Sequence, residues 1–244
     1  MAPLTLVLSP HLDDAVLSCS SLMASRRSLI ATFFSAGDAS YESRRAEDFE
    51  AAKIIGAGTK HLGFRDAPFR SVRYQSFAGI VAGQAHPSIK VENALTLVLE
   101  EFQPELVLAP LGVGNHVDHR LLRDAATKLV RPEQLLYYED LPYAFVKHQI
   151  DFTVGTAPQP DWDSYFAAQY VKTYLGGTAP EAVKKAFSAS QPFHGVQPTQ
   201  RFPPPDLAAL RAYKTQLSDL FQTPAAMAAL YASRPEQYWA KTLA

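Results

Sequence analysis

Short apolar runs alternate with longer amphipathic segments along the first 140 residues, and this alternation strongly limits what the chain can fold into. The apolar runs are too short for helices and predict buried strands, whereas the longer segments place their apolar residues at helical spacing. Strands are expected at 4–8, 29–35, from 60 onward, 105–109 and 135–138, and helices at 14–27, 42–55, 91–102 and 121–130. Alternating strands and helices predict a mostly parallel sheet with helices on both faces.

The pattern therefore predicts the α/β class, with a Rossmann-like three-layer sandwich and the sheet as its middle layer. No GxGxxG sequence follows the first expected strand, and no GxxxxGK[ST] sequence occurs in the chain. The usual backbone cradles for dinucleotides and triphosphates are thus missing. A Rossmann-like shape here does not imply a nucleotide.

After Tyr138 the pattern weakens, because prolines interrupt the chain repeatedly and aromatic residues are scattered between them. Helical spacing returns at 207–221 and again at 225–231. We expect a single domain over residues 1–244, since this length suits one hydrophobic core. Residues 1–140 would form the core, and residues 141–244 a loop-rich part whose loops and helices cap the site.

The charge balance indicates what kind of partner the chain binds. Lysine and arginine number 23 against 24 aspartates and glutamates, so the formal net charge is −1. Such a chain has no long-range field for nucleic acid or anionic lipid, and we expect a small-molecule partner, with no nucleic acid and no membrane. The apolar stretch 4–8 is too short for a signal-peptide core or a spanning helix, so we expect a soluble, cytoplasmic protein. Nothing in the sequence indicates an oligomeric state.

Cys19 is the only cysteine, which excludes an intrachain disulfide and any cysteine-rich metal cluster. We expect its side chain to be buried on the first helix, as free cysteines usually are. A metal bound by this chain must therefore be held by histidines and carboxylates.

Two loops contain the unusual residues, and each follows an expected strand of the sheet. The first loop has His11, Asp13 and Asp14, and the second has His116 and His119 on either side of Val117-Asp118. Loops after parallel strands gather at one sheet edge, where ligands bind. Two histidines plus a carboxylate form the usual ligand set of a catalytic zinc site with an open position for water.

A purely structural explanation competes with this hypothesis. Asp13 or Asp14 could cap the first helix, and Asn115 or Asp118 could cap the next, since these residue types favour that position. One loop alone would decide little. Two histidine and aspartate clusters after two strands of one sheet favour the catalytic interpretation.

At these residues the sequence resembles the PIG-L or LmbE-like zinc-dependent N-acetylglucosaminyl deacetylases. Their first motif, Ala/Pro-His-Pro-Asp-Asp, corresponds to Pro10-His11-Leu12-Asp13-Asp14, and their second, His-x-Asp-His, to His116-Val117-Asp118-His119. The resemblance covers the first half well and the second half thinly. It also includes Arg44, Glu47, Ala51, Gly56, the segment Gly63-Phe64-Arg65-Asp66, and Tyr213-Lys214-Thr215-Gln216-Leu217.

The resemblance implies that His11, Asp14 and His119 bind one Zn²⁺ per chain. Sites of two histidines and an aspartate accept several divalent metals, so iron, manganese and cobalt are alternatives to zinc. The ion would lower the pKa of a bound water and polarise an amide carbonyl.

The resemblance also implies the catalytic roles. Asp13 would be the general base, and His116 would stabilise the oxyanion or protonate the leaving amine, with Asp118 orienting it. The chain departs from the family at Leu12, where proline is usual, and at Ala15, where an acidic residue often follows. It also lacks a tyrosine next to His116 that some relatives use for the oxyanion; Tyr143 or another C-terminal aromatic residue could replace it.

Arg44 and Asp66 match family positions that contact the sugar, and we expect them to bind substrate. The alternatives are a helix-surface ion pair of Arg44 with Glu47 or Asp48, and a turn role for Asp66 before Pro68. The remaining histidines and the aromatic residues of the C-terminal part are expected to be structural or exposed. These are His61, His86, His148, His194, Trp162, Tyr165, Phe166, Tyr170 and Tyr174.

The function that follows is that of a zinc-dependent N-deacetylase, a hydrolase that removes an N-acetyl or other N-acyl group. Its substrate would be an amino sugar or a sugar-containing small metabolite. Two alternatives stay open: an amidase of a thiol conjugate or natural-product intermediate with the same metal site, and a non-catalytic sugar-binding member of the fold.

Overall fold

The computed structural model describes residues 2–82 and 88–242, and a seven-stranded sheet runs through its centre. The strand order is β3-β2-β1-β4-β5-β7-β6, and the first five strands in this order are parallel. β7 is antiparallel to both of its neighbours. The strands are β1 (Thr5–Ser9), β2 (Ser28–Thr32), β3 (Gly58–His61), β4 (Leu106–Pro110), β5 (Leu135–Tyr138), β6 (Val196–Phe202) and β7 (Glu236–Lys241).

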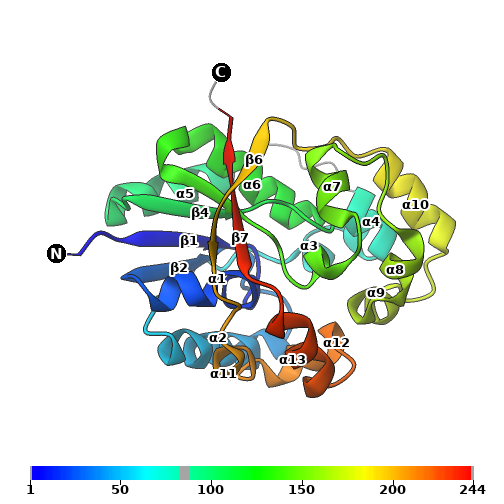
Figure 1. The fold of residues 1–244 in the computed structure, drawn as a ribbon, viewed down its shortest axis with the longest axis horizontal. Helices are drawn as coiled ribbons and strands as arrows, with labels where there is room; N and C mark the ends of the chain where they lie inside the picture. The colour runs from blue at the N-terminus through cyan, green and yellow to red at the C-terminus, as the bar shows by residue number, and fades with distance from the viewer. Residues whose placement is uncertain (1, 83–87, 243–244) are drawn as a thin grey trace.

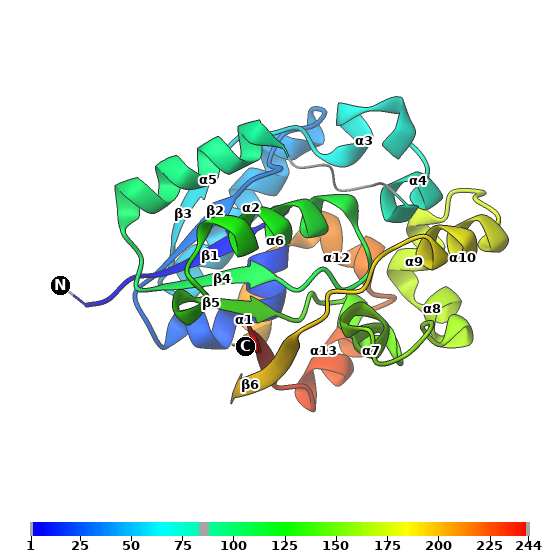
Figure 2. The same cartoon turned by 90° about the horizontal axis from the view of Figure 1, so that it is seen from above.

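Four long helices complete the three layers, as the alternation in the sequence predicts. Helices α1 (Asp14–Ala24) and α2 (Ser40–Ile54) cover one face of the sheet, and α5 (Ile89–Phe102) and α6 (Val117–Leu129) cover the other (Figures 1 and 2). The predicted α/β class and the mostly parallel sheet are confirmed.

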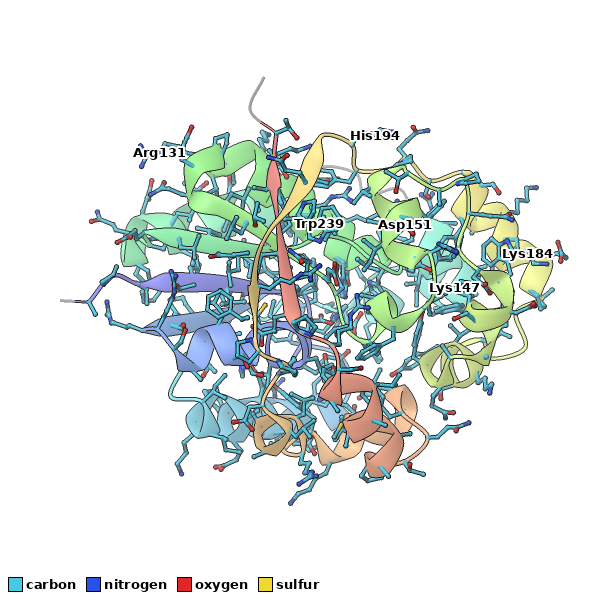
Figure 3. The ribbon with its side chains drawn as sticks, viewed as in Figure 1. Arg131, Lys147, Asp151, Lys184, His194 and Trp239 are labelled. Atoms are coloured by element: carbon cyan, nitrogen blue, oxygen red, sulfur yellow. The ribbon has the colours of Figure 1, made fainter. Side chains whose placement is uncertain are left out.

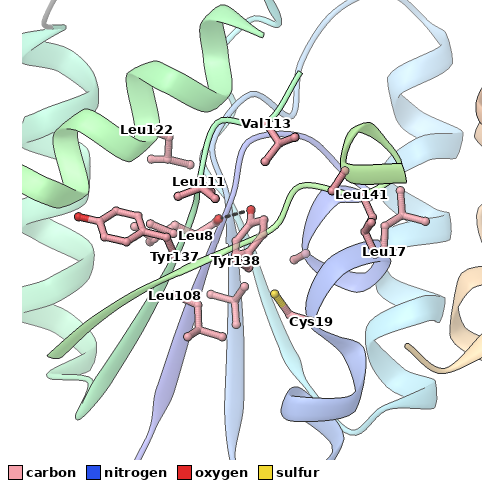
Figure 4. Packing of buried hydrophobic residues seen from close by; sticks show 14 of the residues in the cluster. Leu8, Leu17, Cys19, Leu108, Leu111, Val113, Leu122, Tyr137, Tyr138 and Leu141 are labelled. Atoms are coloured by element: carbon pink, nitrogen blue, oxygen red, sulfur yellow. Dashed lines mark hydrogen bonds between the residues drawn. The ribbon is translucent and has the colours of Figure 1, made fainter. Parts of the chain in front are cut away.

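The central strands are buried on both faces, which explains their continuous apolar runs. All five residues of β1 are buried, and Leu8 on β1 lies beside Tyr138 at the end of β5 (Figure 4). The Tyr138 hydroxyl donates a hydrogen bond to the Leu8 carbonyl oxygen at 2.9 Å. Cys19 is buried in the same cluster, as expected.

The C-terminal part contains two strands that the sequence pattern does not predict. β6 is largely exposed, contains Pro198 and has a register shift between Pro198 and Arg201, so it lacks the regular alternation of a typical strand. β7 begins with the buried polar residues Glu236 and Gln237. Figure 3 shows Trp239 on this strand, where its indole nitrogen donates to Glu139 at 3.1 Å. Both strands are defined by long-range pairing rather than by local pattern.

Short helices also form after Tyr138, where the sequence predicts only loops. These helices, α7 to α10, lie together with α4 at one end of the molecule, beyond the carboxyl ends of the parallel strands (Figures 1 and 2). The helical stretch predicted at 207–221 is divided into α11 and α12, and the one predicted at 225–231 is α13. The shorter helices are α3 (Ala67–Arg70), α4 (Phe77–Ala82), α7 (Gln149–Val154), α8 (Trp162–Ala167), α9 (Gln169–Tyr174), α10 (Pro180–Ser188), α11 (Leu207–Leu210), α12 (Lys214–Leu220) and α13 (Pro224–Ala232). Among the described residues, no helix combines the length and apolar character that crossing a bilayer needs.

Candidate metal centre and cleft

The loops after β1 and β4 meet because these two strands are neighbours in the sheet. They bring together His11 and Asp14 from one loop and His119 from the first turn of α6. One potential ligand atom from each of these three buried residues lies within 4.8 Å of the others. The predicted juxtaposition of two distant segments is thus present.

The arrangement of ligand atoms fits a metal ion. The Asp14 Oδ2 atom lies 3.1 Å from His11 Nδ1 and 3.3 Å from His119 Nε2. Ligands that are about 2.1 Å from a tetrahedral ion are separated by about 3.4 Å, which is close to both distances. Among the residues that the structure describes, the buried His119 Nε2 atom has no hydrogen-bond partner. The Nε2 nitrogen and the Asp14 oxygen are both electron-rich, so they repel each other at 3.3 Å unless a proton or a cation lies between them.

Asp140, directly after β5, fixes the orientation of His119. Its Oδ1 atom lies 2.6 Å from His119 Nδ1, so this nitrogen donates its hydrogen and leaves Nε2 free to bind a cation. Its Oδ2 atom accepts hydrogen bonds from the amides of Gly112 and Val113, each at 2.8 Å. A carboxylate behind a metal-binding histidine is typical of metal sites. From the sequence, Glu139 and Asp140 after the apolar run 135–138 are acidic groups near this sheet edge that could add to a sugar site or begin a loop; a role for Asp140 behind His119 does not follow from it.

The carboxylates around the centre strongly favour positive charge there. Burial alone would lower the pKa of His119, but Asp14 and Asp140 outweigh it and raise that pKa to about 9. Burial is likewise outweighed at His11, whose pKa is raised by Asp66, Asp118 and Asp14. A site that binds protons this well is also suited to a cation.

Asp13 has the position of a helix cap but does not act as one. It is the residue before α1, yet its side chain accepts no hydrogen bond from the helix. Its carboxylate lines a cleft above the centre. Burial, together with the charge of Asp14, raises the pKa of Asp13 to about 6. The carboxylate is therefore available to a molecule in the cleft.

His116 takes the cap position of α6, which the structural alternative assigned to Asn115 or Asp118. Its Nδ1 atom accepts a hydrogen bond from the Asp118 amide at 3.2 Å, so the neutral ring has its hydrogen on Nε2. Burial and the neighbouring His11 lower the pKa of His116 to about 3. Asn115 instead donates from its side chain to the Val81 carbonyl oxygen at 2.7 Å.

The carboxylate of Asp118 lies near two histidine rings, because one potential ligand atom each of His11, His116 and Asp118 lies within 4.8 Å of the others. It accepts hydrogen bonds from Arg70 and from the Ala67 amide, the latter at 3.0 Å. Its Oδ2 atom also lies 3.4 Å from His11 Nε2. Asp118 thus contacts His116 through its backbone and His11 through its carboxylate.

Asp66 precedes the short helix α3, as a turn residue would, and its carboxylate also contacts His11. Its Oδ1 atom is 3.4 Å from His11 Nε2 and has no hydrogen bond, while its Oδ2 atom accepts one from the Tyr41 hydroxyl. Both nitrogens of His11 therefore face carboxylates.

Arg44 does not form the helix-surface ion pair that was considered. Its Nε atom donates to Gln216 Oε1 at 2.9 Å, and its guanidinium lies 4.7 Å from the centre of the Tyr41 ring. Burial opposes the charged form of Arg44, but the surrounding acidic groups, Asp13 first among them, together outweigh it and raise the pKa of Arg44. On the same helix, the Glu47 carboxylate accepts hydrogen bonds from the backbone amide and the hydroxyl group of Thr215. Helix α2 is thereby joined to the segment 213–217.

These residues surround a cleft of about 440 Å³. The loops of the candidate metal centre contribute Asp13, Asp14 and His116 to the lining, and side chains from the C-terminal helices complete the wall. The lining consists of His11, Asp13, Asp14, Ser40, Tyr41, Arg44, Asp66, Pro68, Phe69, Phe77, Ile80, His116, Pro142, Tyr143, Tyr170, Tyr174, Thr215, Gln216, Asp219 and Leu220.

Tyr143 is the aromatic residue next to the metal centre. Its ring lies 5.4 Å from the His119 ring, measured between centroids, and packs on Gly114. Gly114 has a φ of 86°, and a Cβ at this position would overlap the Tyr143 ring. The loop that holds His116 thus needs glycine to let Tyr143 approach.

The other histidines lie away from the three ligand residues. His61 is 2.7 Å from Asp48, a carboxylate partner that the sequence did not suggest, and Asp48 also accepts a hydrogen bond from Tyr213 at 2.8 Å. His148 pairs with Asp151 at the surface, and His194 is exposed. His86 lies outside the described residues. Among the C-terminal aromatic residues, Tyr170 and Tyr174 line the cleft.

Fold and ligand set together define an α/β protein with a two-histidine, one-aspartate candidate metal centre at the carboxyl edge of its sheet. Residues 6–130 match the family described as PIG-L: GlcNAc-PI de-N-acetylase. The chain belongs to this family, and the resemblance seen in its two motifs is confirmed.

Individual relatives support the same assignment. The chain is 32% identical over 167 residues to 2'-N-acetylparomamine deacetylase of Streptomyces fradiae, an alignment that spans 60% of this chain and 60% of that protein. A triple mutant of a teicoplanin-pathway deacetylase, Orf2*T, is 20% identical with a TM-score of 0.63, over 97% of this chain and 96% of its own. The A40926 pseudoaglycone deacetylase Dbv21 is 23% identical with a TM-score of 0.58, over 98% of both chains. The two solved structures share the fold.

Proposed function

We propose that this chain is a metal-dependent deacetylase that removes the N-acetyl group from an amino-sugar-containing small molecule. The observation that supports this most is the buried His119 Nε2 atom, which accepts no hydrogen bond within the described residues and lies 3.3 Å from Asp14 Oδ2, with the Asp13 carboxylate lining the cleft nearby. The Streptomyces fradiae relative, named for deacetylation of an acetylated paromamine, supports the substrate class.

His11, Asp14 and His119 would hold the ion, and Asp140 keeps His119 in the tautomer that leaves Nε2 free. A divalent ion at this place supplies two effects, a lower pKa of bound water and a polarised amide carbonyl. Asp13 would take the proton from the attacking water and return it to the amine nitrogen as the C–N bond breaks, because its carboxylate borders the cleft and does not cap α1.

His116 would stabilise the negative oxygen that develops on the attacked carbonyl. Its Nδ1 atom accepts from the Asp118 amide, so its Nε2–H is the group that can donate into the cleft. Because the lowered pKa keeps the ring neutral near pH 7, hydrogen-bond donation suits His116 better than proton transfer from an imidazolium. Asp118 would orient both His116 and His11.

Arg44 and Asp66 would contact the hydroxyl or amide groups of the sugar. Both line the cleft, and Asp66 Oδ1 is a buried acceptor without a hydrogen bond. A buried acceptor of this kind is expected to bind a donor from the ligand.

The test is an acetate-release assay on purified protein that has been stripped of metal and reloaded with Zn²⁺, Fe²⁺, Mn²⁺ or Co²⁺. Teicoplanin deacetylase Orf2 is known in a zinc-inhibited form, so one equivalent of zinc is compared with an excess. We expect hydrolysis of N-acetylglucosamine-type substrates that a chelator abolishes and one equivalent of metal restores. Chelator-resistant activity, or metal binding without hydrolysis of any N-acyl sugar, would disprove the proposal. A preference for long-chain or non-sugar amides would replace the substrate class and keep the mechanism.

A further inference from the structure

The charges that line the cleft are unbalanced. Of the described lining residues, Asp13, Asp14, Asp66 and Asp219 are carboxylates, and Arg44 is the only arginine or lysine. A divalent ion and Arg44 together would balance three of the four carboxylates. The guanidinium of Arg44 is already bound by Gln216. The cleft therefore disfavours a substrate with a phosphate or carboxylate and favours one with a positive charge.

Asp219 is the carboxylate that the proposed mechanism does not use. It lies on α12, on the C-terminal wall of the cleft, whereas Asp13 and Asp14 belong to the start of α1. Within the described part of the chain, its carboxylate has no hydrogen-bond or ion-pair partner. Tyr174 on the neighbouring helix α9 lines the same cleft, and α9 packs against α12.

Aromatic side chains lie open in the same cleft. Tyr174 is 46% exposed and Phe69 is 39% exposed, although both are large and apolar in most of their surface. Aromatic rings attract ammonium groups as well as the apolar faces of sugars. Lys147 and Lys184, which could compete for a carboxylate, do not line the cleft and lie on the outer α7–α10 end of the molecule (Figure 3).

Two buried polar atoms in the cleft also indicate a polar ligand. Asp66 Oδ1 and the Tyr170 hydroxyl form no hydrogen bond within the described ranges 2–82 and 88–242, and both residues line the cleft with more than nine tenths of their surface buried. Buried groups of this kind normally have a partner, which a bound molecule would provide.

We propose that the outer part of the cleft selects substrates with a free cationic amine in addition to the acylated nitrogen, and that Asp219 and Tyr174 bind this amine. The inference rests on the proposed function and narrows its substrate class to partly acetylated polyamino sugars. Asp219 is a specificity-determining residue in this scheme, and the acetylated nitrogen remains at the metal centre.

The test compares three substrates with the zinc-loaded full-length protein: 2'-N-acetylparomamine, which has further free amines, neutral N-acetylglucosamine, and anionic N-acetylglucosamine 6-phosphate. We expect kcat/KM to fall in this order. D219N should lower the ratio of the cationic to the neutral substrate about fivefold, the effect of losing one partly exposed ion pair. D163N makes the same charge change on the exposed surface of α8, outside the cleft, and should leave this ratio unchanged.

A salt series gives a second readout that needs no variant. Raising the salt from about 0.05 M to about 0.5 M should increase KM for the cationic substrate and leave that for the neutral one nearly constant. The inference is overturned if D219N keeps the wild-type ratio or if the phosphate-bearing sugar is the better substrate. If N-acetylglucosamine is still hydrolysed in that experiment, only the inference fails and the proposed function stands. If the zinc-loaded protein hydrolyses none of the three, the proposed function itself has failed.

Discussion

Two regions meet at the cleft, and they contribute to it in different ways. The loops after β1 and β4 supply the proposed metal ligands His11, Asp14 and His119, which are buried and follow adjacent strands of a parallel sheet. The C-terminal helices supply partly exposed side chains such as Tyr174 and Asp219 from short elements. Rigid strand ends suit chemistry that needs fixed distances, whereas surface helices can change without disturbing the sheet. The difference suggests that reaction type is determined by the first region and substrate choice by the second.

The largest expected effect separates two neighbouring aspartates of the first region. D13N should lower kcat about 10³-fold while the protein keeps its metal, because the variant loses only the general base. D14N should lose both metal and activity, because it removes a ligand. Metal content by elemental analysis and acetate release in the same samples give the comparison. A D13N variant with near-normal kcat would show that another group takes the proton.

The next effect concerns Asp140, which lies where the two regions join. D140N should weaken metal affinity about 10- to 100-fold, because the amide no longer holds His119 as a carboxylate does. Competition with a chromophoric chelator measures this affinity. E139Q is the matched control, because the adjacent Glu139 binds Arg234 and Trp239 instead of a metal ligand. Equal affinity in D140N and the wild type would contradict this positioning role.

A smaller effect tests Arg44, which lies on α2 and reaches the second region through its hydrogen bond to Gln216. R44A should raise KM about tenfold with a smaller change in kcat, consistent with the loss of one charge-assisted hydrogen bond to the substrate. R45A removes the neighbouring arginine, which donates to the Ser35 carbonyl oxygen and does not line the cleft. Its KM should stay at the wild-type value. If both variants behave alike, Arg44 supports the helix and does not contact the substrate.

The smallest effect concerns the hydrogen bond between Tyr213 in the C-terminal part and Asp48 on α2. Y213F should lower the free energy of unfolding by about 1–2 kcal/mol, because buried Asp48 loses a hydrogen bond. Y231F is the control, since the buried Tyr231 hydroxyl has no partner and its removal should cost little. Chemical denaturation measures both values. A Y213F variant as stable as Y231F would show that the Asp48 network contributes little to docking.

The two regions also differ in how far the sequence predicts them. His11, Asp14 and His119 could be predicted because a parallel sheet brings the ends of its central strands together, whatever the details of the loops. Strands β6 and β7 could not, because their residues are partly polar and their pairing partners are distant in the chain. Local pattern determines the core, while tertiary pairing determines the rest.

The same limit explains the partners that were missed around the site. Arg44 binds Gln216, 172 residues away, whereas spacing along the helix offered only Glu47 or Asp48 as alternatives to a substrate contact. Asp140 follows a strand adjacent to β4, so strand order would have placed it near His119 had the order been known. Such contacts join residues that are far apart in the chain, so they can be predicted only when the tertiary arrangement is known.

A crystal structure of the zinc-loaded protein, with anomalous data collected at the zinc edge, tests the central claim most directly. The expected result is one ion bonded to His11, Asp14 and His119 at about 2.0–2.2 Å, with the Asp13 carboxylate beside it and not bonded to it. An ion bound elsewhere, or one that lacks either histidine as a ligand, would contradict the proposed mechanism.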